Sequence, residues 1–189
     1  MNGISVKYLQ ERIAFGRDEV AYRELFLTFY KGLFRLALEV VKCRESSEEV
    51  VSDVMMKIWT MNGKLAEIDN LKVYLYKATL HTAINQKQKN NRYLAGQVQN
   101  WDMEIIDQIP SALTSNPEEK LIRNEWSDEV KAAVESLPPK CRLAYKLIRE
   151  NGLTYKEVAG IMDISENTVD RHLNTAIHKL VDALKIYKD

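Results

Sequence analysis

The sequence has few residues that stabilise a fold covalently or interrupt its backbone. It contains two cysteines, four prolines and seven glycines in 189 residues. Cys43 and Cys141 lie far apart and neither belongs to a CxxC pair, so the sequence predicts no disulfide framework and no zinc site. This use of cysteine fits a reducing compartment.

Long apolar runs and an excess of one charge are also missing. No uncharged apolar run approaches the ~20 residues that span a bilayer, and the N-terminal segment lacks the apolar core of a signal peptide. We therefore expect a cytoplasmic protein without direct membrane insertion. Basic and acidic residues number 27 each, and a net charge of zero argues against a protein that coats DNA by charge alone.

The charges are unevenly distributed along the chain. Residues 71–101 contain five basic residues and no acidic one, whereas residues 101–119 contain five acidic residues and no basic one. Neighbouring segments of opposite charge suggest separate surfaces for separate partners. For either run taken alone, a solvated face is the simpler explanation.

Helical spacing of apolar residues dominates the sequence, and no strand alternation persists, which predicts an all-α fold. Residues 95–116 are rich in turn-forming residues and precede Pro117, a favourable first residue of a helix. We therefore predict two small helical domains, residues 1–94 and 117–189, joined by a linker over 95–116. The expected helices cover 5–15, 18–41, 46–59, 70–92, 117–136, 140–150, 154–162 and 165–184.

The segment from Thr154 to Val181 has the pattern of two helices joined by a tight turn. Thr154 and Glu157 have capping-box spacing, and Ser165 is a good N-cap for the second helix. Such a pair is typical of a helix-turn-helix, whose second helix enters a DNA major groove. An ordinary helical hairpin fits the spacing equally well. The polar face of the second helix carries Glu166, Asn167, Asp170, Arg171, Asn174, Thr175 and His178.

Two helices of the first half have polar faces that suit partners. In the helix expected to start at Ser46, one face is acidic and partly apolar, and it either docks a protein or is simply solvated. The helix capped by Asn70 has tyrosines beside basic residues, which suits nucleic-acid backbones and stacked bases. Its later half carries Lys77, His81, Asn85, Lys87, Lys89 and Arg92. No second histidine or cysteine lies at ligand spacing from His81, so we expect no metal site.

Taken in order, these segments resemble the small, two-domain, extracytoplasmic-function (ECF) type of bacterial RNA polymerase sigma factor, of the sigma-70 family. The resemblance covers roughly residues 18–184. It is carried in the first half by AYRELFLTFYKGLFRLAL, SSEEVVSDVMMKIW and YLYKATLHTAINQKQK, and in the second by LPPKCRLAYKLIRENGLTYKEVAGIMDISENTVDRHLNTAIHKL. It implies a transcription initiation factor without an active site, a cofactor or a small-molecule substrate.

The resemblance also implies partners and site residues. The first domain would dock on the β′ clamp of core RNA polymerase and recognise the downstream (minus ten) promoter element. The second would bind the β flap and read the upstream (minus thirty-five) element. A membrane-anchored anti-sigma factor is the further partner implied, and the acidic linker would lie in the polymerase's basic channel.

By position, the implied docking residues are Glu49, Ser52, Asp53 and Met56. The helix over 70–92 and the loop before it match the part that opens DNA and holds a flipped base, with Lys77, His81, Asn85, Lys87, Lys89 and Arg92 as its DNA-binding residues. The upstream site comprises Glu166, Asn167, Thr168, Asp170, Arg171, Asn174 and Thr175.

Several positions depart from the family pattern, which leaves the promoter sequence open. Gln is usual at Ser52, Phe at Met55, Asn at His81 and Asp at Asn85, and Arg is frequent at His172 and Thr175. The alternative is a stand-alone helix-turn-helix regulator, which usually dimerises on paired half-sites. An all-α enzyme is a third hypothesis, but no nucleophile motif, phosphate loop or paired carboxylates support it. The basic helix and docking face of the first domain favour the sigma factor.

Overall fold

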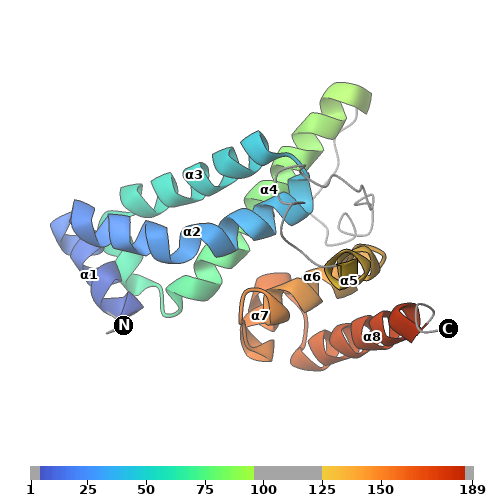
Figure 1. Cartoon of the computed structure of the whole chain (residues 1–189). Helices are drawn as coiled ribbons and strands as arrows, with labels where there is room; N and C mark the ends of the chain where they lie inside the picture. The colour runs from blue at the N-terminus through green and yellow to red at the C-terminus, as the bar shows by residue number, and fades with distance from the viewer. Residues whose placement is uncertain (1–4, 96–124, 186–189) are drawn as a thin grey trace. The chain divides into compact units, whose positions relative to one another are not determined.

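A computed structural model of the chain describes residues 5–95 and 125–185, with side chains over 5–89 and 130–183. Every regular element in these residues is a helix, which confirms the all-α prediction (Figure 1). The chain divides into two compact units, Met1–Gln99 and Asn100–Asp189. The predicted linker begins at the end of the last helix of the first unit, and its other residues, 96–116, lie outside the described residues, so the exact domain bounds stay a prediction.

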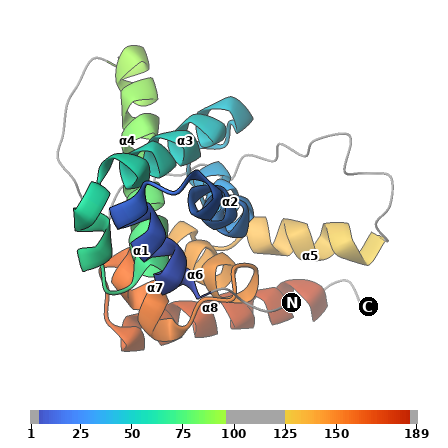
Figure 2. The same ribbon diagram turned by 90° about the vertical axis from the view of Figure 1, so that its left-hand side faces the viewer.

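The first unit consists of α1 (Val6–Gly16), α2 (Glu19–Val41), α3 (Arg44–Thr60), the short 3₁₀ helix η1 (Asn62–Glu67) and α4 (Leu71–Ala95). Helices α2, α3 and α4 pack against one another. Helix α1 packs on α2 and on η1, although η1 follows it by more than forty residues (Figure 2). The first helix therefore supports the turn that leads into α4.

The predicted apolar faces of α2 and α3 are buried. On α2 these are Ala21, Leu25, Phe29, Leu33, Leu36, Ala37 and Val40, and on α3 they are Val50, Val51, Val54, Met55 and Ile58. Helix α4 buries more than its predicted stripe, because it packs against both α2 and α3. Tyr76, Thr79 and Ala83 are buried in addition to the predicted Leu71, Leu75, Leu80 and Ile84, whereas the predicted Tyr74 and Ala78 are only half-buried.

Side-chain N-caps start two helices of this unit, and the predicted start of a third helix is wrong. Asp18 accepts hydrogen bonds from the backbone N–H groups of Val20 and Ala21, at 2.9 and 3.0 Å, and Asn70 caps α4. Helix α3, however, begins at Arg44 instead of Ser46. Lys42 adopts a left-handed conformation (φ 56°) directly after α2, so the chain turns at once and the next residue is already the N-cap of α3.

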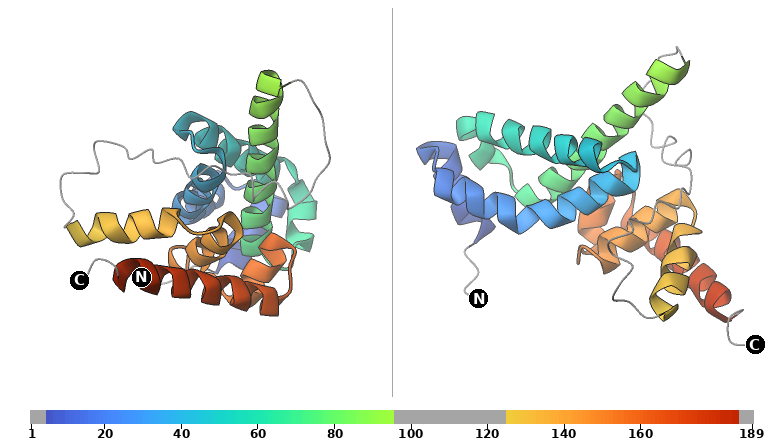
Figure 3. Two further views of the ribbon diagram at one scale, coloured as in Figure 1. Left: turned by 90° about the vertical axis from the view of Figure 1, so that its right-hand side faces the viewer. Right: turned by 45° about the horizontal axis from the view of Figure 1, so that its top comes forward.

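The second unit contains α5 (Glu125–Glu135), α6 (Pro139–Arg149), α7 (Tyr155–Met162) and α8 (Glu166–Lys185). Helices α5, α6 and α7 all pack against α8 (Figure 3). The predicted capping box is confirmed: Thr154 Oγ1 accepts from the Glu157 N–H at 3.2 Å, and Glu157 Oε2 accepts from the Thr154 N–H at 2.8 Å. The expected start of the first helix at Pro117 lies outside the described residues.

A buried arginine joins two helices of this unit. Arg142 of α6 is only 1% exposed, and its Nη1 donates to the carbonyl oxygens of Glu135 and Leu137 at 2.7 and 3.3 Å. These carbonyls lie where α5 ends, and Pro138 and Pro139 have no N–H to offer them. The guanidinium supplies the missing donors and so ties the end of α5 to α6.

We predict that the charge of Asp18 stabilises the first unit in a pH-dependent way. The N–H of Ala21 and then the Arg12 guanidinium, 2.6 Å away, lower the pKa of Asp18 below its ordinary value of 3.8. Asp18→Asn keeps a capping oxygen but removes the charge, so it should lower the unfolding temperature at pH 7. Because the folded pKa is depressed, this difference should persist above about pH 4 and vanish as the pH falls through the folded pKa.

Thermal unfolding followed by circular dichroism between pH 2 and 7 measures this difference. The control is Glu19→Gln, which removes the same charge one residue away, from an exposed position. An equal loss of stability in both variants would contradict the role of the Asp18 ion pair.

Candidate nucleic-acid and protein interfaces

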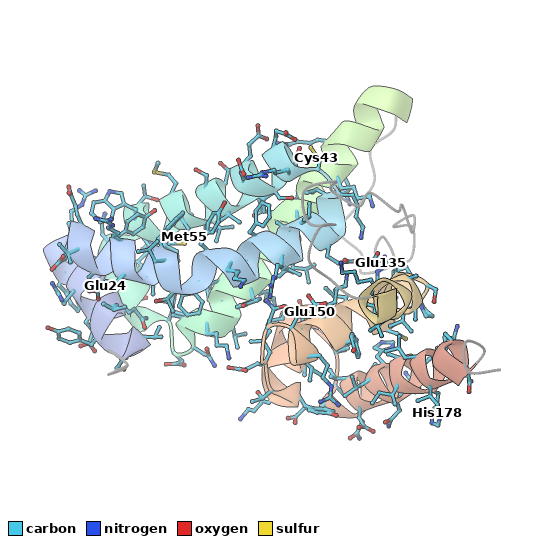
Figure 4. All side chains as sticks on the ribbon, viewed as in Figure 1. Glu24, Cys43, Met55, Glu135, Glu150 and His178 are labelled. Carbon is cyan, nitrogen blue, oxygen red and sulfur yellow. The ribbon has the colours of Figure 1, made fainter. Side chains whose placement is uncertain are left out.

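The four predicted docking residues lie on one exposed stripe of α3. Glu49, Ser52, Asp53 and Met56 follow each other at steps of three, one and three residues, and all four are exposed. The opposite side of α3 is buried, and its Met55 lies between α3 and α2 (Figure 4). We call these four residues the docking stripe.

The docking stripe combines negative charge with an exposed apolar side chain. Met56 is 59% exposed, and the carboxylates of Glu49 and Asp53 lie along the same side of the helix. Gln86 of α4 donates to Glu49 Oε2 at 3.3 Å and holds one end of the stripe. A partner with basic and apolar side chains would complement this surface.

Four of the predicted DNA-binding residues share one side of α4. At 100° per residue, Lys77, His81, Asn85 and Lys89 fall opposite the buried Thr79 and Ala83. The first three are half-buried and Lys89 is exposed. We call these four residues the α4 stripe; its lysines and polar groups suit a nucleic-acid backbone.

The other two predicted residues of α4 stand differently. Lys87 falls on the side of the helix that carries the buried Leu80 and Ala83, so the structure does not bring it together with the α4 stripe. It is nonetheless half-exposed, because the C-terminal part of α4 extends beyond α2 and α3 (Figures 1 and 3). Arg92 lies on α4, but its side chain is outside the described residues.

The segment before α4 is the 3₁₀ helix η1, where the sequence suggests only a loop or broken turn. Within η1, Leu65 is fully buried, whereas Asn62, Lys64 and Glu67 are exposed. The side chain of Gln10, on α1, donates to two carbonyl oxygens of this segment. Gln10 is not among the residues predicted from the sequence, although its spacing from Ile13 and Ala14 places it on the buried side of α1.

The leading end of α8 presents an exposed polar face. Asn167, Arg171 and Asn174 fall opposite the buried stripe of Val169 and Leu173, as predicted. A helix-turn-helix places this part of its second helix against base edges. The amide of an asparagine suits adenine and a guanidinium suits guanine, so these residue types are appropriate for reading bases.

The remaining predicted residues of α8 are partly occupied by local hydrogen bonds. Asp170 is exposed, but its Oδ2 accepts from Asn174 Nδ2 at 3.0 Å, which orients both side chains. Thr168 lies within 2.8 Å of the capping Ser165 hydroxyl, and the Thr175 hydroxyl donates to the Arg171 carbonyl oxygen at 2.8 Å. Glu166 is exposed at the first position of the helix. Thr168 and Thr175 are both half-buried and lie at the edge of this face.

His172, which departs from the family pattern, does not lie on the exposed polar face of α8. His172 is half-buried beside α6, where its Nδ1 lies 3.5 Å from the sulfur of the buried Cys141. The two residues are 31 positions apart, and no spacing in the sequence indicates this contact. His172 is therefore part of the packing between α6 and α8.

Metal sites and membrane-spanning helices are both absent from the part of the chain that the structure describes. Within it, no three His, Cys, Asp or Glu side chains gather closely enough to hold a metal ion. No helix among the same residues has the length and apolar character that crossing a bilayer requires.

Family models match both units of the chain. A model described as Sigma-70 region 2 matches residues 25–93, and one described as Sigma-70, region 4 matches residues 127–180. The first range contains the docking stripe and the α4 stripe, and the second contains α7 and the leading end of α8. Each candidate interface therefore lies within a matched segment.

Curated relatives match most of the chain. The ECF RNA polymerase sigma-E factor of Escherichia coli (strain K12) is 28% identical over 170 residues, which cover 85% of this chain and 84% of that protein. The RNA polymerase sigma-H factor of Pseudomonas aeruginosa (strain PAO1) is 24% identical over 179 residues, covering 94% and 92%.

Two solved structures share the fold. One is the sigma factor RpoE in complex with the anti-sigma factor NepR from Bartonella quintana, with a TM-score of 0.64, 20% identity and coverage of 87% of this chain and 97% of that one. The other is CnrH in complex with the cytosolic domain of CnrY, with a TM-score of 0.66, 14% identity and coverage of 96% and 99%. With both region models matched in order along one chain and ECF relatives over most of its length, this protein belongs to the sigma-70 family of RNA polymerase sigma factors, in its extracytoplasmic-function group.

Proposed function

We propose that this sigma factor divides promoter recognition between two helical domains, residues 1–94 and 117–189, joined by a linker over 95–116. The first domain docks on core RNA polymerase and contacts the downstream element, and the second reads the upstream element. The observation that supports this division is that each matched segment carries its own exposed polar face on a helix whose other side is buried.

The two interfaces of the first domain differ in chemistry, which suits two partners. The docking stripe is acidic with an exposed methionine, so it fits a protein surface such as the polymerase β′ clamp. The α4 stripe carries two lysines and is preceded by the exposed polar residues of η1. We assign the α4 stripe, with Lys87 and Arg92 of the same helix, to binding the opened downstream element and its flipped base.

In the second domain, we assign direct base reading to the exposed Asn167, Arg171 and Asn174. Glu166 and Asp170 lie beside them, and an acidic side chain accepts from the amino group of cytosine. Thr168 and Thr175 are assigned to the edge of the same contact. We further propose that this domain binds the β flap, which would hold it at the correct distance from the clamp.

The protein acts, in this proposal, by binding alone and in the cytoplasm, without a catalytic site or cofactor of its own. A membrane-anchored anti-sigma factor is the proposed inhibitor. One of the two solved structures that share this fold is a sigma factor bound to an anti-sigma factor, which supports a partner of this class.

Run-off transcription with purified core polymerase tests the proposed function. On the promoter region of its own operon, the protein should produce a discrete transcript that core polymerase alone does not produce. Without polymerase it should bind the same DNA weakly, because few phosphate contacts release few counterions. Tight sequence-specific binding by the protein alone would favour the stand-alone regulator. Adding the anti-sigma partner should abolish the transcript, and a transcript that persists would contradict that part of the proposal.

The docking stripe generates a second prediction. Met56→Ala should weaken core polymerase binding roughly tenfold, as removal of a central apolar contact at a protein interface does. Leu27→Ala is the matched control, because Leu27 is 65% exposed on α2, against 59% for Met56. Equilibrium binding of labelled protein to core polymerase measures both. Equal losses in the two variants would show that the stripe is misplaced.

The face of α8 generates a third prediction. Asn167→Ala and Arg171→Ala should each reduce use of the upstream element by roughly 10- to 100-fold, the value of one good base contact. Core binding should be unchanged. Lys179→Ala removes an exposed cation from α8 away from this face and is the control. Transcription from promoters with intact and substituted upstream elements measures the effect, and loss of polymerase binding in either variant would contradict the assignment.

A further inference from the structure

The backbone of η1 is held from outside by a side chain of α1. Gln10 is 1% exposed, and its Nε2 donates to the carbonyl oxygens of Leu65 and Ile68 at 2.6 and 2.8 Å. An amide nitrogen has two N–H groups, so both of its donors are used. The acceptors lie 55 and 58 positions further along the chain, so this contact closes a long loop of sequence.

The backbone hydrogen bonds at the two ends of η1 are longer than those from Gln10. The N–H of Lys64 and the N–H of Ile68 reach the carbonyl oxygens of Met61 and Leu65 at 3.3 Å each. A 3₁₀ turn has poorer hydrogen-bond geometry than an α-helix, so contacts from outside the segment contribute more to holding it. Lys7 of α1 adds a third contact, from its Nζ to the carbonyl oxygen of Ala66 at 3.0 Å.

The support acts on one side of the segment and leaves the other side exposed. Leu65 is fully buried and fixes the inner side. The outer side presents Asn62, Gly63, Lys64, Glu67 and Asp69, all exposed and directly before α4. Asn62 has a left-handed backbone (φ 51°), a conformation that asparagine adopts more readily than most residues other than glycine.

We propose that Gln10 is a positioning residue for promoter recognition: by holding the carbonyls of Leu65 and Ile68, it fixes the outer side of η1 in the shape that accepts a base of the opened downstream element. Lys7 assists from the surface. Both residues lie on α1, before residues 25–93, the segment that the region 2 family model matches. The inference rests on the proposed role of η1 and α4 at the downstream element.

The test uses Gln10→Met, which keeps the length of the side chain and removes both donors. The wild-type and variant proteins, each bound to core polymerase, are titrated with fork DNA whose downstream element is single-stranded. A second fork carries one substituted base in that element. We expect unchanged core binding and a roughly tenfold loss of discrimination between the two forks, because the segment is no longer held in one geometry. Lys7→Ala should shift discrimination in the same direction by less.

Ser47→Ala is the matched control for a general loss of stability. Ser47 is also fully buried in the first unit, and its hydroxyl donates to the Cys43 carbonyl oxygen at 2.6 Å. This contact lies in the first turn of α3, at the opposite end of the helix from η1. This variant should lose stability but keep its discrimination. If it loses discrimination as Gln10→Met does at equal stability, the positioning role is overturned.

Amide hydrogen exchange on the free protein tests whether Gln10 holds η1, separately from the effect of Gln10 on DNA binding. Exchange of the Lys64 and Ile68 amides should become faster in Gln10→Met and stay unchanged in Ser47→Ala. Faster exchange with full discrimination between forks would overturn the positioning role. If the wild-type complex itself fails to distinguish the forks, the proposed function of this segment is wrong, whatever the variants do.

Discussion

Burial of one apolar stripe fixes the rotation of each helix about its own axis, and every candidate interface of this protein depends on that constraint. On α8, the buried Val169 and Leu173 leave Asn167 and Arg171 no direction but outward. On α3, burial of Val54 and Ile58 exposes the docking stripe in the same way. The exposed faces therefore need no loops to present them, and each is as rigid as the helix that carries it.

In each unit, a buried polar side chain hydrogen-bonds to backbone carbonyl oxygens of a neighbouring segment. In the first unit, Gln10 donates to carbonyls of η1, and in the second, Arg142 donates to carbonyls at the end of α5. An unpaired buried carbonyl is costly, so these contacts stabilise the segment and also restrict its geometry. In both cases the donor lies on a neighbouring helix, so the shape of η1 and of the end of α5 depends on helix packing.

The first unit keeps two surfaces of different charge on adjacent helices. Helix α3 carries the acidic docking stripe and α4 carries the lysines of the α4 stripe, and a hydrogen bond from Gln86 to Glu49 joins the two helices. The sequence has equal numbers of acidic and basic residues, so this separation is invisible in the net charge. In the proposed function, this separation lets one small unit contact a protein and a nucleic acid without the two partners competing for the same side chains.

The sequence by itself determined the features that depend on neighbours within about four positions. These are the all-α fold, the caps at Asp18, Asn70 and Thr154, and the exposed stripes of α3 and α8. Helical spacing alone also places Lys87 away from the α4 stripe. Two features were decided by the tertiary structure: the earlier start of α3 and the His172–Cys141 contact. The hydrogen bonds from Gln10 to the Leu65 and Ile68 carbonyl oxygens belong with them. These acceptors lie more than fifty positions away, and only the packing of α1 brings them within hydrogen-bonding distance. Helical period and capping chemistry are local, whereas a donor and an acceptor far apart in the chain meet only when the core has set the helices in place.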